Sequence, residues 1–173
     1  MSGLRDDEIE RLAELLRRVA DAGLGTPRLP GPVFAALRGV VAQPTAELLL
    51  TRPDGTVFLT WREDAHFRGW HLPGGFVGCG EDLARACERL GAAELGVALR
   101  FESIAGHAVW PDHPYASALC LLCRCSSDAD SPSGRFFGVP PEPMLAPHRT
   151  LLLGAGYWGG AEPDASDGPK KAS

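Results

Sequence analysis

Residues 74–97 read Gly-Gly-Phe-Val-Gly-Cys-Gly-Glu-Asp-Leu-Ala-Arg-Ala-Cys-Glu-Arg-Leu-Gly-Ala-Ala-Glu-Leu-Gly-Val, and this is the most informative stretch of the sequence. Five residues separate Gly75 from Glu81, seven separate Glu81 from Arg89, and four separate Arg89 from Glu94. Glycines punctuate both ends, and the central part carries apolar residues at helical spacing. The stretch therefore predicts a glycine-rich loop, a helix over residues 81–95 and a second loop.

This spacing, together with the preceding Leu72-Pro73-Gly74, resembles the sequence box of the Nudix hydrolases, a loop–helix–loop that binds a divalent cation and a diphosphate. The resemblance covers about residues 43 to 150. It implies an α/β fold, namely a Nudix-type α/β/α sandwich with a mixed β-sheet. It also implies an enzyme that hydrolyses a small nucleoside-diphosphate-linked molecule.

Hydrolytic members of that family usually carry carboxylates where this chain has Leu90, Ala93 and Glu94, three positions on one helix face. Of these, only Glu94 offers the oxygen ligands that hard cations bind. The resemblance therefore implies one Mg²⁺, or Mn²⁺ in its place, held by Glu94 and the main-chain oxygen of Gly74. A cluster of two or three metal ions is not expected.

The other box residues are expected to be architectural. By the same resemblance, Glu81 and Arg89 form an ion pair that fixes the loop to the helix. Gly75 and Gly96 belong to this structural set, and Gly96 ends the helix.

The run Glu88-Arg89-Leu90 followed by Ala93-Glu94 resembles the GDP-mannose mannosyl hydrolase branch, which has lost the same two carboxylates. That branch uses one Mg²⁺ to stabilise the leaving nucleoside diphosphate while water attacks the sugar C1 with inversion. Two further positions match it. Arg62 falls where the branch has an arginine that stabilises the leaving diphosphate, and Glu47 where an acidic residue contacts the nucleoside.

The chain also departs from that branch. Phe76 stands where the branch has an arginine that contacts phosphate, and the loop over 126–134 contains Asp128 and Asp130 but no histidine for a general base. Another loop offers substitutes. His113 is a candidate catalytic base near neutral pH, and Tyr115 is a candidate phosphate contact; the alternative is that both are ordinary surface residues.

Composition indicates a small molecule as the partner. The formal net charge of −5 and the pI of about 5.5 argue against binding to a nucleic-acid backbone, which needs clustered Lys and Arg. No apolar run is long enough to cross a bilayer, so we expect no membrane partner and a cytoplasmic protein. A homodimer is left open.

The five cysteines are expected to be reduced, because their number is odd and no secretory signal is visible. Three of them follow the pattern Cys120-x-x-Cys123-x-Cys125, which looks like half of a zinc site. The second half is missing. We therefore interpret residues 117–125 as a buried strand in which Cys acts as a small hydrophobic residue.

The predicted organisation is a helix and Pro-rich connector over residues 1–42, the Nudix domain over 43–158, and a disordered tail over 159–173. A helix over 6–22 is expected to serve as an interface arm, as a lid or, as we favour, as a helix packed on the domain. The elements expected inside the domain are a hairpin of 46–51 and 56–61 around Pro53-Asp54-Gly55, a sharp break at Pro73-Gly74-Gly75, strands over 97–105 and 117–125, and a helix over 147–154.

Three functions compete at this point. The first is Mg²⁺-dependent hydrolysis of a nucleotide sugar at the sugar carbon. The second is cleavage of a phosphorus–oxygen bond in another nucleoside diphosphate derivative. The third is a nucleotide-binding Nudix domain without catalysis, which Leu90, Ala93 and Phe76 favour because each replaces a functional side chain.

Overall fold

The structure, a computed structural model, describes residues 3–23, 29–37, 39–110 and 118–159. Its helical elements are α1 (Asp6–Asp21), α2 (Gly31–Leu37), α3 (Leu83–Leu90), the π-helical turn η1 (Gly91–Leu95), α4 (Ala146–Gly154) and the 3₁₀ turn η2 (Tyr157–Gly159). Its strands are β1 (Gln43–Leu49), β2 (Val57–Glu63), β3 (Arg68–His71), β4 (Gly74–Phe76), β5 (Arg100–Trp110), β6 (Ala118–Ser126) and β7 (Gly134–Phe137).

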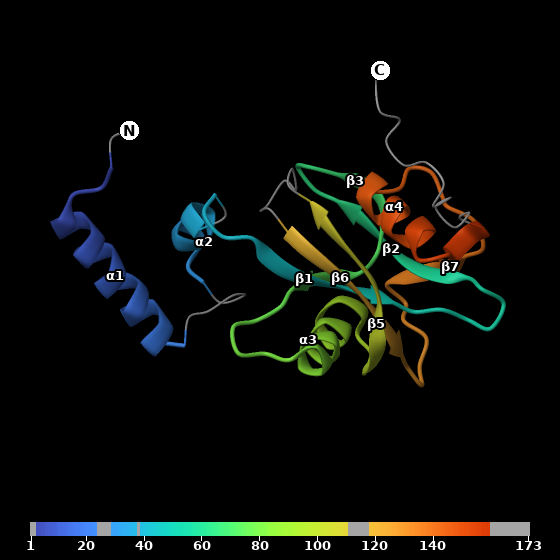
Figure 1. Ribbon diagram of the computed structural model, residues 1–173. Helices are drawn as coiled ribbons and strands as arrows, with labels where there is room; N and C mark the ends of the chain where they lie inside the picture. The colour runs from blue at the N-terminus through green and yellow to red at the C-terminus, as the bar shows by residue number, and fades with distance from the viewer. Residues whose placement is uncertain (1–2, 24–28, 38, 111–117, 160–173) are drawn as a thin grey trace, which may run out of the picture.

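The strands form two sheets. The larger sheet has the order β4-β1-β6-β5, and it is mixed because β1 runs parallel to β6 whereas its other pairs are antiparallel. The smaller sheet, β3-β2-β7, is antiparallel throughout. Helix α3 lies on one side of the strands and α4 on the other (Figure 1). The mixed α/β fold predicted from the sequence is thereby confirmed.

Two hydrophobic cores explain this layered arrangement. Successive side chains of a strand point to opposite faces, so Ala46 and Leu48 of β1 pack in the core beside α3, whereas Leu49 packs in the core beside α4. The first core also contains Leu90 and Leu95 of the box helix, and the second contains Leu151 of α4. Because β1 is buried on both faces, it forms the centre of the fold.

The predicted hairpin of 46–51 and 56–61 is wrong in its pairing. The turn itself forms, with Gly55 at φ 80° donating its N–H to the Arg52 carbonyl (2.9 Å). Beyond an isolated bridge between Thr51 and Val57, however, the two strands enter different sheets. The edges of β1 are taken by β4 and β6, which leaves no free edge for β2.

Other boundaries differ locally. The expected break at Pro73-Gly74-Gly75 contains the start of β4, which pairs with β1, and β7 was not predicted. The box helix is α3 followed by the π turn η1 rather than one regular helix. The expected strand over 97–105 begins at Arg100 and extends to Trp110. The last helix matches its prediction closely.

The cysteine prediction is confirmed. Cys120, Cys123 and Cys125 are buried in β6, and Cys87 is buried in α3. All five cysteines are free thiols, and Cys79 alone is exposed.

The N-terminal helix forms as predicted but does not pack on the domain. None of the residues of α1 is buried, and Ile9, Leu12, Leu15 and Leu16 are 38–50% exposed. Figure 1 shows α1 apart from the two sheets. Within the described part of the chain, no helix combines the length and the apolar character needed to cross a bilayer. Disorder was predicted over 159–173; Gly159 belongs to η2, and residues 160–173 lie outside the described residues.

Gly134 provides a test of the packing between β7 and β2. A Cβ at this position would collide with the main-chain oxygen of Leu59 and lie 2.8 Å from the Phe58 ring. We expect Gly134→Ala to lower the free energy of unfolding by about 1–3 kcal/mol in urea titrations. The matched control is Gly138→Ala, whose nearest neighbour would be Thr56 at 3.8 Å. Equal stability of the two variants would contradict the close approach of these strands.

Candidate active site

The box is held together by one ion pair, as the sequence predicted. Arg89 on α3 donates from Nε to Glu81 Oε1 and from Nη2 to Glu81 Oε2, each at 2.7 Å. The same Nη2 also donates to the Phe76 carbonyl oxygen of β4 at 2.9 Å, and Glu81 Oε2 accepts the Gly78 N–H at 2.7 Å. The guanidinium thus joins strand, loop and helix, and the ion pair raises the pKa of Arg89.

The helix ends are fixed locally. Asp82 caps α3 by accepting the Arg85 N–H at 2.8 Å. At the other end Gly96 adopts φ 67°, a left-handed conformation that glycine takes without strain. Between them, Leu95 is buried in the core, whereas Glu94 is exposed. The π turn therefore exposes the Glu94 side chain, while the neighbouring Leu95 is anchored in the core.

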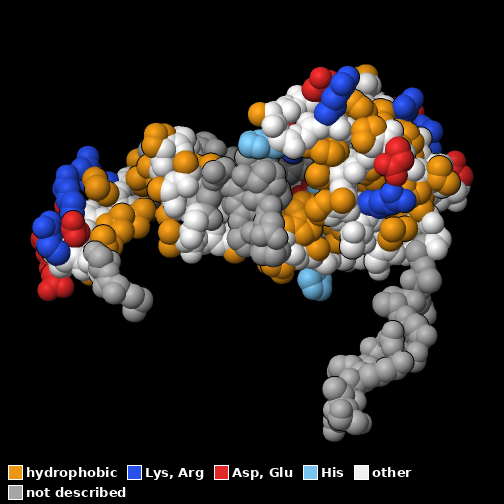
Figure 2. Space-filling model, turned by 90° about the horizontal axis from the view of Figure 1, so that it is seen from above, with side chains coloured by type: hydrophobic (Ala, Val, Ile, Leu, Met, Phe, Trp, Pro, Cys, Tyr) orange, Lys and Arg blue, Asp and Glu red, His pale blue; other side chains and the backbone are white. Residues whose placement is uncertain are grey.

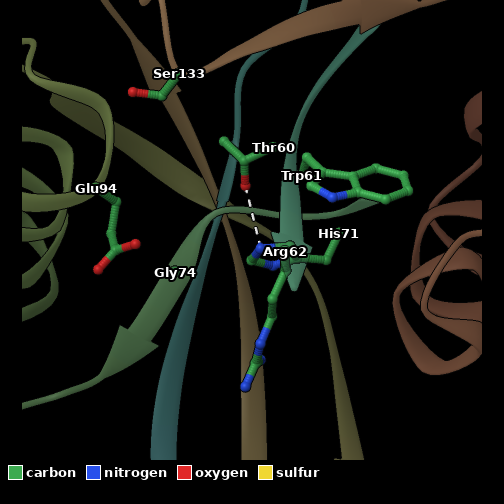
Figure 3. Close-up of a pocket in the computed structure, with 7 residues that line it drawn as sticks. All are labelled: Thr60, Trp61, Arg62, His71, Gly74, Glu94 and Ser133. Atoms are coloured by element: carbon green, nitrogen blue, oxygen red, sulfur yellow. Dashed lines mark hydrogen bonds between the residues drawn. The ribbon is translucent and has the colours of Figure 1, made fainter. Parts of the chain in front are cut away.

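A cavity of about 390 Å³ opens between this turn and β2. Its lining residues come from the box and from the smaller sheet: Thr60, Trp61, Arg62, His71, Gly74, Glu94 and Ser133. In Figure 3 the Glu94 carboxylate projects into the space in front of Gly74, across from the β2 side chains. The fold thus brings together Gly74, Glu94 and Arg62, three of the residues predicted from the sequence.

Glu94 supplies the carboxylate that could bind a metal ion in this cavity. Within the described ranges it forms no hydrogen bond or ion pair, and its carboxylate faces the cavity. Leu90 packs in the core beneath Gly75 instead, and Ala93 offers no ligand. The described residues contain no group of three or more His, Cys, Asp or Glu side chains that could hold a metal. The Glu94 carboxylate and the main-chain oxygen of Gly74 fit a single Mg²⁺ whose other ligands are waters and phosphate oxygens, as is usual for this ion in proteins.

Arg62 extends from β2 at the rim of the cavity and is held by a neighbour. Its guanidinium forms an ion pair with Asp64. Asp64 in turn anchors the following turn by accepting the N–H groups of His66 (2.7 Å) and Phe67 (3.0 Å). Arg62 is 28% exposed in its side chain, so a positively charged group remains accessible beside Gly74 and Glu94.

A second cavity of about 210 Å³ shares Arg62, His71 and Gly74 with the first and extends inward to Glu47. Glu47 is only 6% exposed and accepts the Thr45 hydroxyl at 2.9 Å. Burial is the main reason why its pKa rises to about 7, while the Thr45 hydrogen bond and the charge of Arg62 oppose the rise. The carboxyl of Glu47 therefore holds its proton to a higher pH than an ordinary glutamate does.

His148, at the start of α4, is a site residue that the sequence analysis did not single out. It is 4% exposed, and its Nε2 lies 3.5 Å from Glu47 Oε2. Its Nδ1 accepts the Leu72 N–H at 2.9 Å, so the neutral ring carries its proton on Nε2, facing Glu47. The one sequence signal was that Glu47, a carboxylate in an apolar strand, needed a buried partner.

His71, which lines both cavities, has a structural role. Its Nε2 lies 3.2 Å from the Thr60 hydroxyl, and burial lowers its pKa to about 4. The ring is therefore neutral at physiological pH and contributes no charge to the cavity.

The structure does not test the candidates His113 and Tyr115, and it places the other two loop carboxylates away from this site. His113 and Tyr115 lie outside the described residues. Asp128 pairs with Arg100 at 2.7 Å and Asp130 with Arg52 at 3.2 Å, both on the surface. Neither carboxylate lines the two cavities at the box.

Fold and site together define an α/β sandwich in which a loop–helix–loop, locked by an ion pair, presents one acidic side chain to a cavity. Comparison with known protein families supports the same fold. The NUDIX domain model matches residues 41–139, more than half of the chain. The chain belongs to the NUDIX family of hydrolases.

Solved structures show the same fold at low sequence identity. A MutT NUDIX hydrolase from Burkholderia pseudomallei has a TM-score of 0.56 at 22% identity, covering 65% of this chain and 96% of that one. The E. coli ORF135 protein has a TM-score of 0.53 at 17% identity, with coverages of 66% and 89%. A NUDIX-family hydrolase from Clostridium perfringens has a TM-score of 0.52 at 12% identity, with coverages of 67% and 95%. No curated protein matches the sequence.

The raised pKa of Glu47 predicts how stability depends on pH. The folded protein holds this proton up to about pH 7, whereas an ordinary glutamate has a pKa of 4.5. The folded state is therefore favoured at low pH, and this advantage, at most about 3 kcal/mol, is lost as pH rises from 4.5 through 7. Glu47→Gln removes the titration, so the stability of the variant relative to the parent should increase from pH 5 to pH 8. Urea titrations at both pH values measure this, and a constant difference would contradict the buried-acid assignment.

Proposed function

We propose that the chain hydrolyses a nucleoside-diphosphate-linked substrate, with a nucleotide sugar as the first choice and one Mg²⁺ as cofactor. One observation carries the proposal. Glu94, exposed and without a partner in the described ranges, faces the same cavity as Gly74 and Arg62. These groups supply one carboxylate, one main-chain oxygen and one cation, a combination suited to a diphosphate and a single ion.

Glu94 and the main-chain oxygen of Gly74 would hold the metal ion. When bound, Mg²⁺ supplies charge neutralisation on the departing diphosphate. Leu90 is in the core and Ala93 lacks a donor, which favours one ion over several. A single metal ion held by these ligands is poorly suited to activating a water molecule for attack on phosphorus. For that reason we prefer cleavage at the sugar carbon over cleavage at phosphorus.

Arg62 is assigned to the diphosphate. A guanidinium can bind two phosphate oxygens in parallel, and Arg62 lines both cavities. Its ion pair with Asp64 keeps the side chain in place before substrate arrives, so little rotamer entropy remains to be lost on binding. Glu47, at the inner end of the second cavity, is assigned to the nucleoside.

Two histidines near the cavities are candidates for the general base. His71 is neutral, partly buried and hydrogen-bonded, and His148 is enclosed with Glu47 and Leu72. Both therefore suit structural roles. His113 stays our candidate base, because an imidazole can serve as a base near neutral pH, and Tyr115 stays our candidate phosphate contact.

Removing the single carboxylate tests the metal assignment. We expect Glu94→Gln to reduce Mg²⁺-dependent turnover by at least about 10²-fold, because no other box side chain can replace it. Glu88→Gln is the matched control: Glu88 is exposed on α3 and lines neither cavity. Both variants should show the parental thermal unfolding. Unchanged activity of Glu94→Gln would refute the assignment of the metal ligand.

Product analysis tests the reaction. The chain is incubated with Mg²⁺ and a panel of nucleotide sugars, dinucleoside polyphosphates and nucleoside triphosphates, and products are identified by mass. Cleavage at the sugar carbon yields free sugar and nucleoside diphosphate, which is the expected result. Nucleoside monophosphate with sugar phosphate would instead support phosphorus–oxygen cleavage. Nucleotide-dependent thermal stabilisation without any turnover would support a binding domain and overturn the proposal.

A further inference from the structure

Helix α1 is a large feature that the proposed function leaves unused. Its hydrophobic side chains at Ile9, Leu12, Leu16 and Val19 are separated by three, four and three residues, the a and d pattern of two heptads. This seam is uncovered, since no residue of α1 is buried. Figure 2 shows hydrophobic side chains on the surface of α1 among its charged ones. A helix with such a seam needs a partner.

The charges of α1 favour a protein partner over a membrane. Acidic side chains outnumber the arginines along the helix. Helices that lie on membranes instead carry a polar face rich in Lys and Arg, which is attracted to anionic lipids. An acidic helix would be repelled from such a surface, so another helix is the better match.

The order of the charges along α1 points to a second copy in the antiparallel direction. The first turn carries Asp6, Asp7 and Glu8, while Arg17 and Arg18 lie near the other end. A parallel pair would place the acidic turns side by side. An antiparallel pair places each acidic turn beside the arginines of the other helix, and it also opposes the two helix dipoles favourably.

We propose that two copies of the chain associate through their α1 helices in antiparallel orientation. Leu12 of each helix then packs against Leu16 of the other, and Ile9 packs against Val19. In this register the acidic first part of each helix, with Glu8 and Glu10, lies at the level of Arg17 and Arg18 of the partner helix. The seam and the distribution of charge along the helix are thus compatible with the same alignment.

The expected association depends on concentration. A helix of 16 residues is about 24 Å long, so this contact lies at the low end of interface sizes. Sedimentation equilibrium of the full chain should show the mass rising with concentration from 18.4 kDa toward twice that value. A parent that stays monomeric at the highest soluble concentration would overturn the proposal.

Charge reversal tests the orientation. Arg17→Glu/Arg18→Glu makes both ends of the helix acidic, and Glu8→Arg/Glu10→Arg places basic side chains in the segment that faces Arg17 and Arg18 of the partner, so each variant alone should lose association by about tenfold or more. Mixed in equal amounts, the two variants restore both complementary ends and should form a heterodimer. This recovery shows that the two ends meet between chains. The loss in each single variant separates the orientations, because a parallel pair already places like charges side by side in the parent. Circular dichroism checks that both variants keep α1 helical.

The control is Glu14→Gln. Glu14 lies on the side of α1 opposite the seam and is paired with Arg11 at 2.8 Å, so its replacement should leave the parental mass curve unchanged. Charge-reversed variants that each remain dimeric would show that copies meet through another surface. Variants that stay monomeric when mixed would equally overturn the antiparallel seam.

Discussion

The site depends on the position of one guanidinium. Arg89 reaches from α3 to both oxygens of Glu81 and to the Phe76 carbonyl of β4. A planar fork of donors can satisfy three acceptors at once only if strand, loop and helix stand in one arrangement. That arrangement places the π turn, and with it Glu94, across the cavity from Gly74. An ammonium group in place of Arg89 could not impose the same geometry.

A second constraint comes from the close approach of β4 to β1. Gly74 lies opposite Glu47, and a side chain at Gly74 would collide with the Ala46 carbonyl and with the Glu47 carboxylate. The residue proposed to offer its main-chain oxygen must therefore be glycine for steric reasons alone. The same contact helps to cover Glu47, and burial raises the pKa of that carboxyl. The proposed metal ligand and the buried acid are thus coupled through one point of backbone packing.

The proposed self-association would place function and assembly in separate parts of the chain. The NUDIX model begins at residue 41, whereas the α1 seam ends at Val19. The site residues described above all come from the domain itself. A dimer through α1 would accordingly change the concentration and spacing of sites without completing them.

The box could be predicted from the amino-acid sequence: fixed spacing specifies the loop, the helix, the Glu81–Arg89 pair and the single carboxylate at Glu94, because all of these are local features of one short segment. The family and the mixed α/β class followed from it. The three-dimensional fold was needed to show that β1 and β2 belong to different sheets and that His148 lies beside Glu47, about a hundred residues away in sequence. Strand pairing and burial depend on which distant segments compete for the same edge, and no local pattern records that competition.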